Sequence, residues 1–261
     1  YFFLIVITAC MLLPFLWMLS SSFKLNKDVF GFPIQWIPKN PRWQNYVDIW
    51  TQIPLLTFVK NTVKITVVVT LLQLFTSSFA AYAFAKMQFK GKNALFLGYI
   101  ATIAVPWQAY MVPQFMMMSS WHLNNTHLAI MCLQAFSAFG VFLMKQFSEG
   151  IPTEMLEAAR IDGASEARTF VKIVLPMVKP GIGALAIFTF INSWNDYFMQ
   201  LIMLSSTSNL TISLGIAKLQ AENSTDFGLI MAGAALAAVP IIIIFLIFQK
   251  YFTKGIAMGA V

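Results

Sequence analysis

Seven residues at fixed spacing form the most specific pattern in this chain. They occupy a soluble-looking stretch inside a sequence that is otherwise apolar. The seven are Glu157, Ala158, Ala159, Gly163, Ile173, Leu175 and Pro176. Seven specified positions carry far more information than a single pair of glycines. A polar insert of this kind brings an apolar protein no advantage on its own. The pattern therefore predicts a surface that a partner protein binds.

The first half of residues 149–180 predicts a short helix. Pro152 suits a first helical turn, where its missing N–H would be unpaired anyway. Glu157 falls early in the helix, where the dipole favours negative charge. Ala158 and Ala159 are strong helix formers with almost no side chain, so another surface can approach the backbone closely.

The second half predicts a turn and an amphipathic helix. Gly163 can take the left-handed conformation that ends a helix, and Ser165 can cap the next one. Phe170, Ile173 and Val174 then fall on one helix face. We therefore expect residues 149–180 to form a compact two-helix knob that protrudes from its surroundings.

The composition places the chain in the membrane class. Of its 261 residues 59% are hydrophobic and 10% are charged, against about 25% charged in soluble domains. Cys10 and Cys132 lie in apolar runs, and there is no His/Cys cluster, so we expect no disulfide and no metal site. Because the sequence begins at Tyr1 inside an apolar run, we expect the natural protein to begin further upstream.

Continuous apolar runs predict an all-α polytopic membrane protein with one transmembrane domain over residues 1–261. Each run has about the 20 residues that a spanning helix needs, and none alternates as barrel strands do. The six predicted spans are residues 1–22, 58–85, 94–118, 126–146, 181–204 and 228–252. Residues 205–227 are rich in Ser, Thr and Asn and predict a solvated connector.

The distribution of basic residues predicts the orientation. Ten Lys and Arg follow the even-numbered spans and five follow the odd-numbered ones. Basic residues concentrate on the cytoplasmic side, so both termini and the knob should face the cytoplasm. The net charge of +7 is explained by this membrane orientation, with lipid as the partner and no nucleic acid.

Three stretches of the chain resemble one family. The spacing in residues 157–176, the sequence FINSWNDYF at 190–198 and the ending KGIAMGAV at 254–261 are similar to those of ATP-binding-cassette (ABC) importer permeases. The likeness covers nearly the whole chain and is strongest to the smaller permease subunit of maltose-type carbohydrate importers. It implies a type I ABC importer transmembrane fold with six spanning helices.

The resemblance also implies the partners. Glu157, Ala158, Ala159 and Gly163 would sit in a cleft of a separate ATPase dimer, which would bind ATP and Mg²⁺ and drive the helices through the knob. The chain itself has no P-loop sequence and needs no cofactor. A second, homologous permease would complete a heterodimer in the cell membrane, and a sugar-binding protein would deliver the cargo from outside.

A polar stretch in the fifth predicted span is the candidate substrate path. Asp196 is the one acid placed inside a span, where charge is costly and usually faces a cavity or a partner. Asn192 and Asn195 would share its helix face, beside Trp194 and Tyr197. Amides, a carboxylate and aromatic rings suit a sugar, but the same face could join helices. Three further amides could line the path or only bond between helices: Gln108, Gln114 and Gln134.

Two other functions remain open from the sequence. One keeps the importer and changes the cargo to an amino acid, a polyamine or an ion. The other is a self-sufficient secondary transporter, which would need ion-coupling acids in its spans and would leave the knob without a role.

Overall fold

The computed structural model describes residues 1–222 and 226–259, and these residues form helices and turns with no strand. The predicted all-α class is therefore confirmed. The longest apolar helices are α1 (Phe2–Ser22), α4 (Leu55–Lys86) and α15 (Phe227–Gly259). They match the first, second and sixth predicted spans closely, and Pro14 and Pro240 stay inside α1 and α15 without ending them.

Two bent helix pairs are also apolar enough to cross a membrane. α7 (His127–Leu133) and α8 (Ala138–Glu149) meet at 46°. The segment Glu166–Met177 meets α12 (Lys179–Asn195) at 78°. Within the described residues, three helices are long and apolar enough to cross a membrane, or up to five if each bent pair counts as one.

Three predicted spans are wrong as continuous helices. Residues 126–146 are interrupted between α7 and α8. Residues 94–118 divide into α5 (Lys92–Ala101) and α6 (Met111–Ser120), joined by the 3-10 turns η1 (Thr102–Ala104) and η2 (Trp107–Ala109). Pro106 explains this break, because the residue before a proline disfavours helical dihedrals and Val105 is extended. The predicted span 181–204 ends at Asn195, and a short α13 (Phe198–Met203) follows.

The chain divides into two compact units. Unit 1 comprises residues 1–62 and 205–243, and unit 2 comprises residues 63–204 and 244–261. Besides α1 and the beginnings of α4 and α15, unit 1 contains α2 (Asn26–Val29), α3 (Gln44–Gln52), η4 (Thr207–Asn209) and α14 (Ile212–Glu222).

Buried side-chain hydrogen bonds join the segments of unit 1. The Asn45 amide donates to the carbonyl oxygens of Ser22 and Lys24 at 2.8 and 2.9 Å. The Thr62 hydroxyl accepts from the Ile212 backbone N–H at 2.9 Å. Ile212 is buried at the start of α14, so the predicted solvated connector is wrong over this helix. Its Ser- and Thr-rich start had concealed a helix that packs through Leu214 and Leu219.

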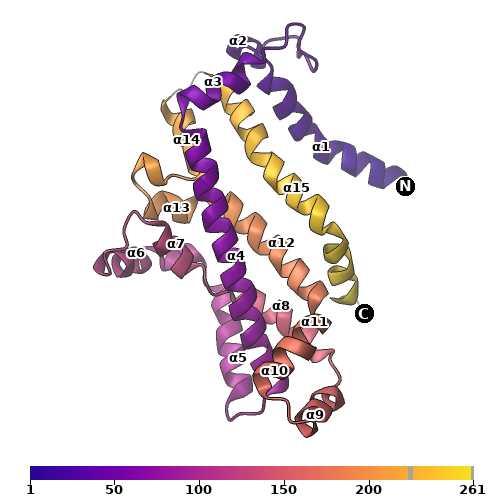
Figure 1. Cartoon of the computed structure of the whole chain (residues 1–261). Coiled ribbons are helices and arrows are strands. Elements are labelled where there is room, and N and C mark those ends of the chain that lie inside the picture. Colours follow the sequence, from indigo (N-terminus) through magenta and orange to yellow (C-terminus); the bar gives the residue numbers. More distant parts are fainter. Residues whose placement is uncertain (223–225, 260–261) are drawn as a thin grey trace. The chain divides into compact units, whose positions relative to one another are not determined.

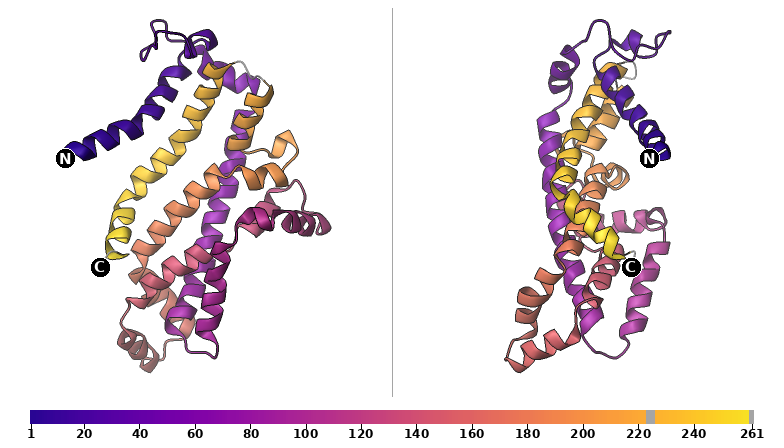
Figure 2. Two further views of the ribbon diagram at one scale, coloured as in Figure 1. Left: turned by 180° about the vertical axis from the view of Figure 1, so that it is seen from behind. Right: turned by 90° about the vertical axis from the view of Figure 1, so that its right-hand side faces the viewer.

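Unit 2 holds the knob, residues 149–180, and the helices that support it. Figures 1 and 2 show α9 (Thr153–Ile161) at the same end of this unit as the connection between α4 and α5. An apolar cluster joins the end of α4 to α8, the knob and α12; its buried members are Ala81, Tyr82, Met144, Ile151, Leu156, Phe170, Val174, Val178 and Leu185. The knob is therefore packed against the other helices of unit 2 through this buried cluster.

Candidate functional site

The first helix of the knob ends as the sequence predicts. Asp162 is the C-cap of α9, and Gly163 follows with a φ of 76°. The N–H of Gly163 donates to the Arg160 carbonyl at 3.0 Å, and that of Ala164 donates to the Ala159 carbonyl at 2.9 Å. This pair of bonds is the Schellman arrangement, which needs a left-handed residue where glycine stands.

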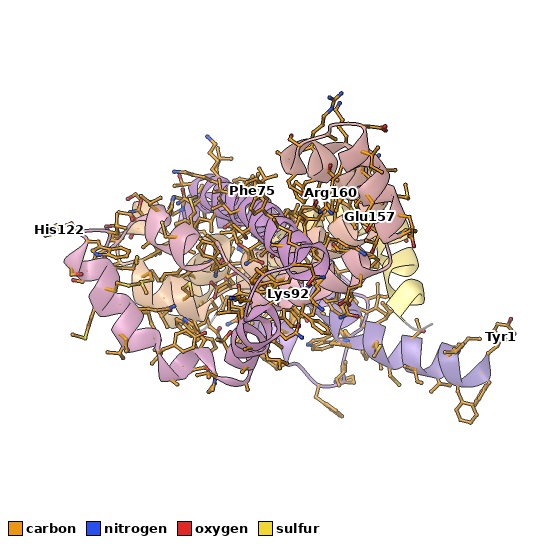
Figure 3. The ribbon with its side chains drawn as sticks, turned by 90° about the horizontal axis from the view of Figure 1, so that it is seen from below. Tyr1, Phe75, Lys92, His122, Glu157 and Arg160 are labelled. Carbon is orange, nitrogen blue, oxygen red and sulfur yellow. The ribbon has the colours of Figure 1, made fainter. Side chains whose placement is uncertain are left out.

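The start of the knob differs by one position from the prediction. Pro152 is the N-cap of α9, with extended backbone, rather than the first helical residue. Glu154 then lies in the first turn, where its charge meets the helix dipole. Figure 3 shows Glu157 and Arg160 on this helix.

The second half of the knob is a helix with one wide turn. Ser165 caps α10 (Glu166–Thr169) by accepting from the Arg168 N–H at 3.3 Å, as predicted. A π-helical turn, η3 (Phe170–Val174), follows and leads into α11 (Leu175–Met177). Phe170 and Val174 are buried on the predicted apolar face, with Ile173 packed beside them.

The seven motif residues separate into an outward and an inward group. Glu157, Ala158, Gly163 and Pro176 are exposed. Ala159 is buried, whereas Ile173 and Leu175 are partly buried against the apolar cluster. The motif thus contributes its exposed residues to the surface of the knob and its buried residues to the packing beneath that surface.

Sequence reasoning missed an exposed apolar residue beside the motif. Ile161, the last residue of α9, is 86% exposed. Its signal was a large aliphatic side chain in a stretch that is otherwise charged or small. Ile161 is thus the most exposed large apolar side chain of α9.

Two side chains of α4 bind the knob. The Tyr82 hydroxyl donates to Glu166 Oε2 at 2.6 Å, and Arg160 Nε donates to Glu166 Oε1 at 2.9 Å. One turn further along α4, Lys86 Nζ donates to the carbonyl oxygens of Glu149 and Ile151. The Tyr82 hydroxyl and then the Arg160 guanidinium hold the pKa of the Glu166 carboxyl below its ordinary value.

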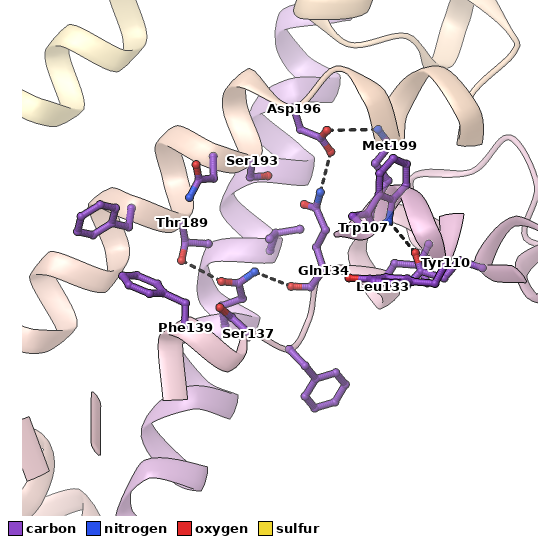
Figure 4. Close-up of a pocket in the computed structure, with 16 residues that line it drawn as sticks. Trp107, Tyr110, Leu133, Gln134, Ser137, Phe139, Thr189, Ser193, Asp196 and Met199 are labelled. Atoms are coloured by element: carbon purple, nitrogen blue, oxygen red, sulfur yellow. Dashed lines mark hydrogen bonds between the residues drawn. The ribbon is translucent and has the colours of Figure 1, made fainter. Parts of the chain in front are cut away.

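A polar cavity of about 400 Å³ lies elsewhere in unit 2 (Figure 4). It is found where α7, α12 and the α5–α6 segment are interrupted. Its polar lining comes from Gln73, Gln114, Gln134, Ser137, Thr189, Asn192, Ser193 and Asp196. Its aromatic lining comes from Trp107, Tyr110, Phe136, Phe139 and Phe188.

The break between α7 and α8 exposes backbone carbonyls that α4 satisfies. Gln73 Nε2 donates to the Gln134 carbonyl at 2.8 Å, and Thr76 Oγ1 donates to the Ala135 carbonyl at 2.9 Å. Non-helical backbone within a membrane is tolerated only where it is buried in protein or lines a cavity, and these two bonds pair its carbonyls from the α4 side. Gln73 also accepts from the Thr189 hydroxyl at 3.0 Å, which brings α12 into the same network.

Asp196 stands at the second break. It is the C-cap of α12, and its Oδ1 accepts from the Met199 N–H at 3.3 Å. Its Oδ2 accepts from Gln134 Nε2 at 2.7 Å. Figure 4 shows both bonds beside the one from Trp107 to Gln114, which measures 2.8 Å.

The structure brings only part of the predicted substrate stretch to the cavity. Asn192 and Asp196 line it, whereas Asn195 is exposed outside the lining. Trp194 is buried against the Phe190 ring at 5.6 Å, and Tyr197 lies half-buried beyond the helix end. Because α12 ends at Asn195, the expected face does not continue as one helix, and Asp196 reaches the cavity from the C-cap position. Of the three further amides, Gln114 and Gln134 line the cavity and Gln108 does not.

Several lining residues escaped the sequence reasoning. Gln73 was detectable as a lone amide within a long apolar run. Trp107 and Tyr110 lie in the interrupted stretch that had been taken for a continuous span, and Thr189 resembles any other helix threonine. The described residues contain no group of three His, Cys, Asp or Glu side chains that could hold a metal ion.

The fold and these two features define an integral membrane transport subunit, and comparison with known proteins identifies its family. The chain belongs to the family of binding-protein-dependent transport system inner membrane components, which matches residues 1–258. This family confirms the predicted class, a multi-pass permease of an ABC importer. It also supports a role in transport rather than in catalysis.

Curated relatives match over almost the whole chain. The arabinooligosaccharides transport system permease AraQ of Halalkalibacterium halodurans is 34% identical over 95% of this chain and 90% of its own length. The lactose transport system permease LacG of Rhizobium radiobacter is 33% identical over 95% and 90%. The melibiose/raffinose/stachyose import permease MelC of Bacillus subtilis is 33% identical over 99% and 94%.

A solved structure shares the fold. It belongs to a bacterial ABC transporter that imports the acidic polysaccharide alginate. A chain of that structure matches 96% of this chain and 94% of its own length, with a TM-score of 0.83 and 24% sequence identity. The type I importer fold predicted from the sequence is thereby confirmed.

Proposed function

We propose that this chain is one of two membrane permeases of an ATP-driven oligosaccharide importer and lines half of the path for the sugar. The observation that carries the proposal is the cavity, where amides and a carboxylate face aromatic rings. The relatives named for arabinooligosaccharides, lactose and melibiose/raffinose/stachyose support the same class of cargo.

The chemistry of the cavity suits a sugar. Gln134, Asn192 and Asp196 present donors and acceptors for hydroxyl groups, and Trp107 and Tyr110 offer flat apolar surfaces for ring faces. A volume of about 400 Å³ falls within the usual range for small-molecule sites. A polyamine carries several positive charges, and the cavity lining offers it only one carboxylate, that of Asp196.

The knob supplies the second part of the proposal. In it, Glu157, Ala158, Gly163 and Ile161 form the surface that a separate ATPase grips, while Ala159, Ile173 and Leu175 keep its shape. The exposed alanine and glycine support this role, because they let a partner approach the backbone. ATP and Mg²⁺ would then be bound entirely by the partner ATPase dimer.

The remaining partners follow from the same machine. In this proposal the knob and both chain ends face the cytoplasm, because Lys and Arg are concentrated in those connections. A second, homologous permease completes the path, and a binding protein delivers sugar from the other side. A related alginate transporter is described in complex with an alginate pentasaccharide-bound periplasmic protein.

The decisive experiment is uptake into liposomes. The complex of this chain with its partner permease, ATPase and binding protein should concentrate an arabinooligosaccharide, lactose or raffinose when ATP is present at the ATPase side. A complex with a hydrolysis-dead ATPase is the matched control and should move none. Uptake by this chain alone, or uptake of an amino acid or polyamine but no sugar, would overturn the proposal.

A further inference from the structure

Two side chains one turn apart on α4 form hydrogen bonds with the knob at two separate points. Tyr82 and Lys86 are four residues apart and therefore share a helix face. Tyr82 binds Glu166 in the second helix of the knob, and Lys86 binds the carbonyls of Glu149 and Ile151 where the knob begins. The last turns of α4 thus form hydrogen bonds with both the beginning and the middle of the knob.

Apolar packing reinforces these hydrogen bonds. The Tyr82 side chain is only 3% exposed, and its ring lies 5.4 Å from that of Phe170. Leu156 of α9 and Val174 of the π-helical turn belong to the same buried cluster. A displacement of either knob helix must therefore move α4 or break this packing.

The same helix reaches the cavity without interruption. Gln73 and Thr76 hold the carbonyls at the α7–α8 break, and they precede Tyr82 by nine and six residues. At 1.5 Å per residue, the distance from Gln73 to Tyr82 along the axis is about 13 Å. Residues 55–86 contain no glycine or proline, so nothing in this stretch of α4 favours a hinge.

The alternative route from the knob to the cavity is less direct. α12 also reaches the cavity, through Thr189 and Asp196. It joins the knob at Val178 across a bend of 78°. Residues 73–86 of α4, by contrast, form one uninterrupted helix that bonds the cavity lining at Gln73 and the knob at Tyr82 and Lys86.

We propose that α4 carries displacement of the knob to the cavity, with Tyr82 and Glu166 as positioning residues that fasten the two together. At the cavity this displacement reaches Gln73, because the Gln73 side chain bonds both the Gln134 carbonyl at the α7–α8 break and the Thr189 hydroxyl. The proposal rests on the proposed function, because it needs an ATPase that moves the knob.

The test distinguishes two roles of the Tyr82–Glu166 bond: transmitting displacement of the knob to the cavity, and shaping the surface that binds the ATPase. The full complex carries a reporter, Asn192→Cys, after replacement of the exposed Cys10 and Cys132 by serine. A small water-soluble maleimide measures the labelling rate of this reporter without nucleotide and with a non-hydrolysable ATP analogue. Copurification of the ATPase is measured in the same samples.

Tyr82→Phe removes the hydroxyl and keeps the buried ring. We expect the ATPase to copurify normally, while the ratio of the two labelling rates falls by roughly tenfold, the effect of losing a hydrogen bond to a charged group. Tyr99→Phe is the matched control, because the Tyr99 hydroxyl, unlike the Tyr99 backbone carbonyl, has no hydrogen bond to any described residue. Glu166→Gln keeps the Tyr82 hydroxyl and an amide oxygen that can accept from it, so this variant should retain part of the ratio that Tyr82→Phe loses.

Three outcomes would overturn the proposal. A Tyr82→Phe ratio equal to that of Tyr99→Phe would show that the bond transmits nothing. Loss of the ATPase in Tyr82→Phe alone would show that it shapes docking instead. An unsubstituted complex without the ATPase would overturn the proposed function and this inference with it, whereas the first two outcomes leave the proposed function intact.

Discussion

The knob and the cavity belong to the same unit but are built in opposite ways. The knob takes its surface from one continuous stretch, residues 149–180, and its turns are set by neighbours in sequence such as Gly163 and Ser165. The cavity takes its polar groups from four separate elements, and the two bonds of Gln73 join it to residues 61 and 116 positions away. Substitutions in a contiguous motif can change the partner that it binds without changing the fold. A cavity lined by several elements depends on how those elements pack, and therefore on the fold itself.

The largest expected effect is on the knob. Gly163→Val forces a β-branched residue into a left-handed conformation, at a cost of about 1–2 kcal/mol or more, so the turn should rearrange. ATPase copurification should fall by roughly tenfold, and transport should fall with it, while the chain still inserts in the membrane.

A matched control exists for this substitution. Gly91 also has a positive φ, 78°, and neither glycine has an atom within 4 Å of an added Cβ. Gly91→Val therefore imposes the same kind of strain outside the knob and should leave the ATPase bound. Equal losses in both variants would show that strain, and not the knob surface, is responsible.

The next effect concerns the bonding network of the cavity. Gln73→Leu leaves the Gln134 carbonyl and the Thr189 hydroxyl without the partner they now share. Each buried group left unpaired costs about 1–3 kcal/mol, so the thermal midpoint of unfolding should fall. ATPase copurification should persist, because Gln73 is remote from the knob; the assay is a melting curve of the purified complex.

The outcome that contradicts this expectation is a stable variant. If Gln73→Leu melted like the unsubstituted complex, water would be pairing the Gln134 carbonyl, and the cavity would be less dependent on the fold than the comparison requires. Gln108→Leu, outside the cavity lining, is the control for a change of hydropathy alone.

A smaller effect separates two neighbouring amides of α12. Asn192 lines the cavity and Asn195 does not. Asn192→Leu should reduce sugar uptake by a few fold to tenfold, as expected for one or two lost hydrogen bonds, while Asn195→Leu should change it little. Uptake that depends on Asn195 and not on Asn192 would place the sugar path along the helix face predicted from the sequence instead of in the cavity.

The smallest expected effect is that of pH on the knob. Because the pKa of Glu166 is lowered, its carboxylate stays charged and bound to Tyr82 and Arg160 until the pH falls through that lowered value. The number of sugar molecules moved per ATP should therefore be constant between about pH 6 and 8. A transition within that range that disappears in Glu166→Gln would contradict the assignment of the pKa.

How much could be predicted follows from the same contrast. The helix cap at Gly163, the cap at Ser165 and the buried face through Phe170 depend on neighbours in sequence, so the knob could be derived before the structure. The all-α class followed from apolar runs alone. The break between α5 and α6 had a sequence signal in Pro106, whereas the break after Asn195 could not be derived, because the apolar run continues through it.

The cavity was out of reach for a related reason. Its composition depends on which helices meet, and that is decided by packing that no single segment reveals. Gln73 acquires meaning only when it faces the Gln134 carbonyl, and the role of Asp196 changes once α12 ends beside it. Residues that share a helix face on paper, such as Asn192 and Asn195, then point to different surroundings.

The π-helical turn at Phe170–Val174 bears on how this permease can vary in length. Such a turn accommodates one residue more than an α-helix would over the same rise. Deleting a residue within it would restore ordinary winding and rotate everything on one side by about 100° relative to the other. Phe170 would then leave the Tyr82 ring, and the knob would turn away from its partner. Natural variants should thus keep the number of residues between Gly163 and Pro176 constant while tolerating many changes of side chain.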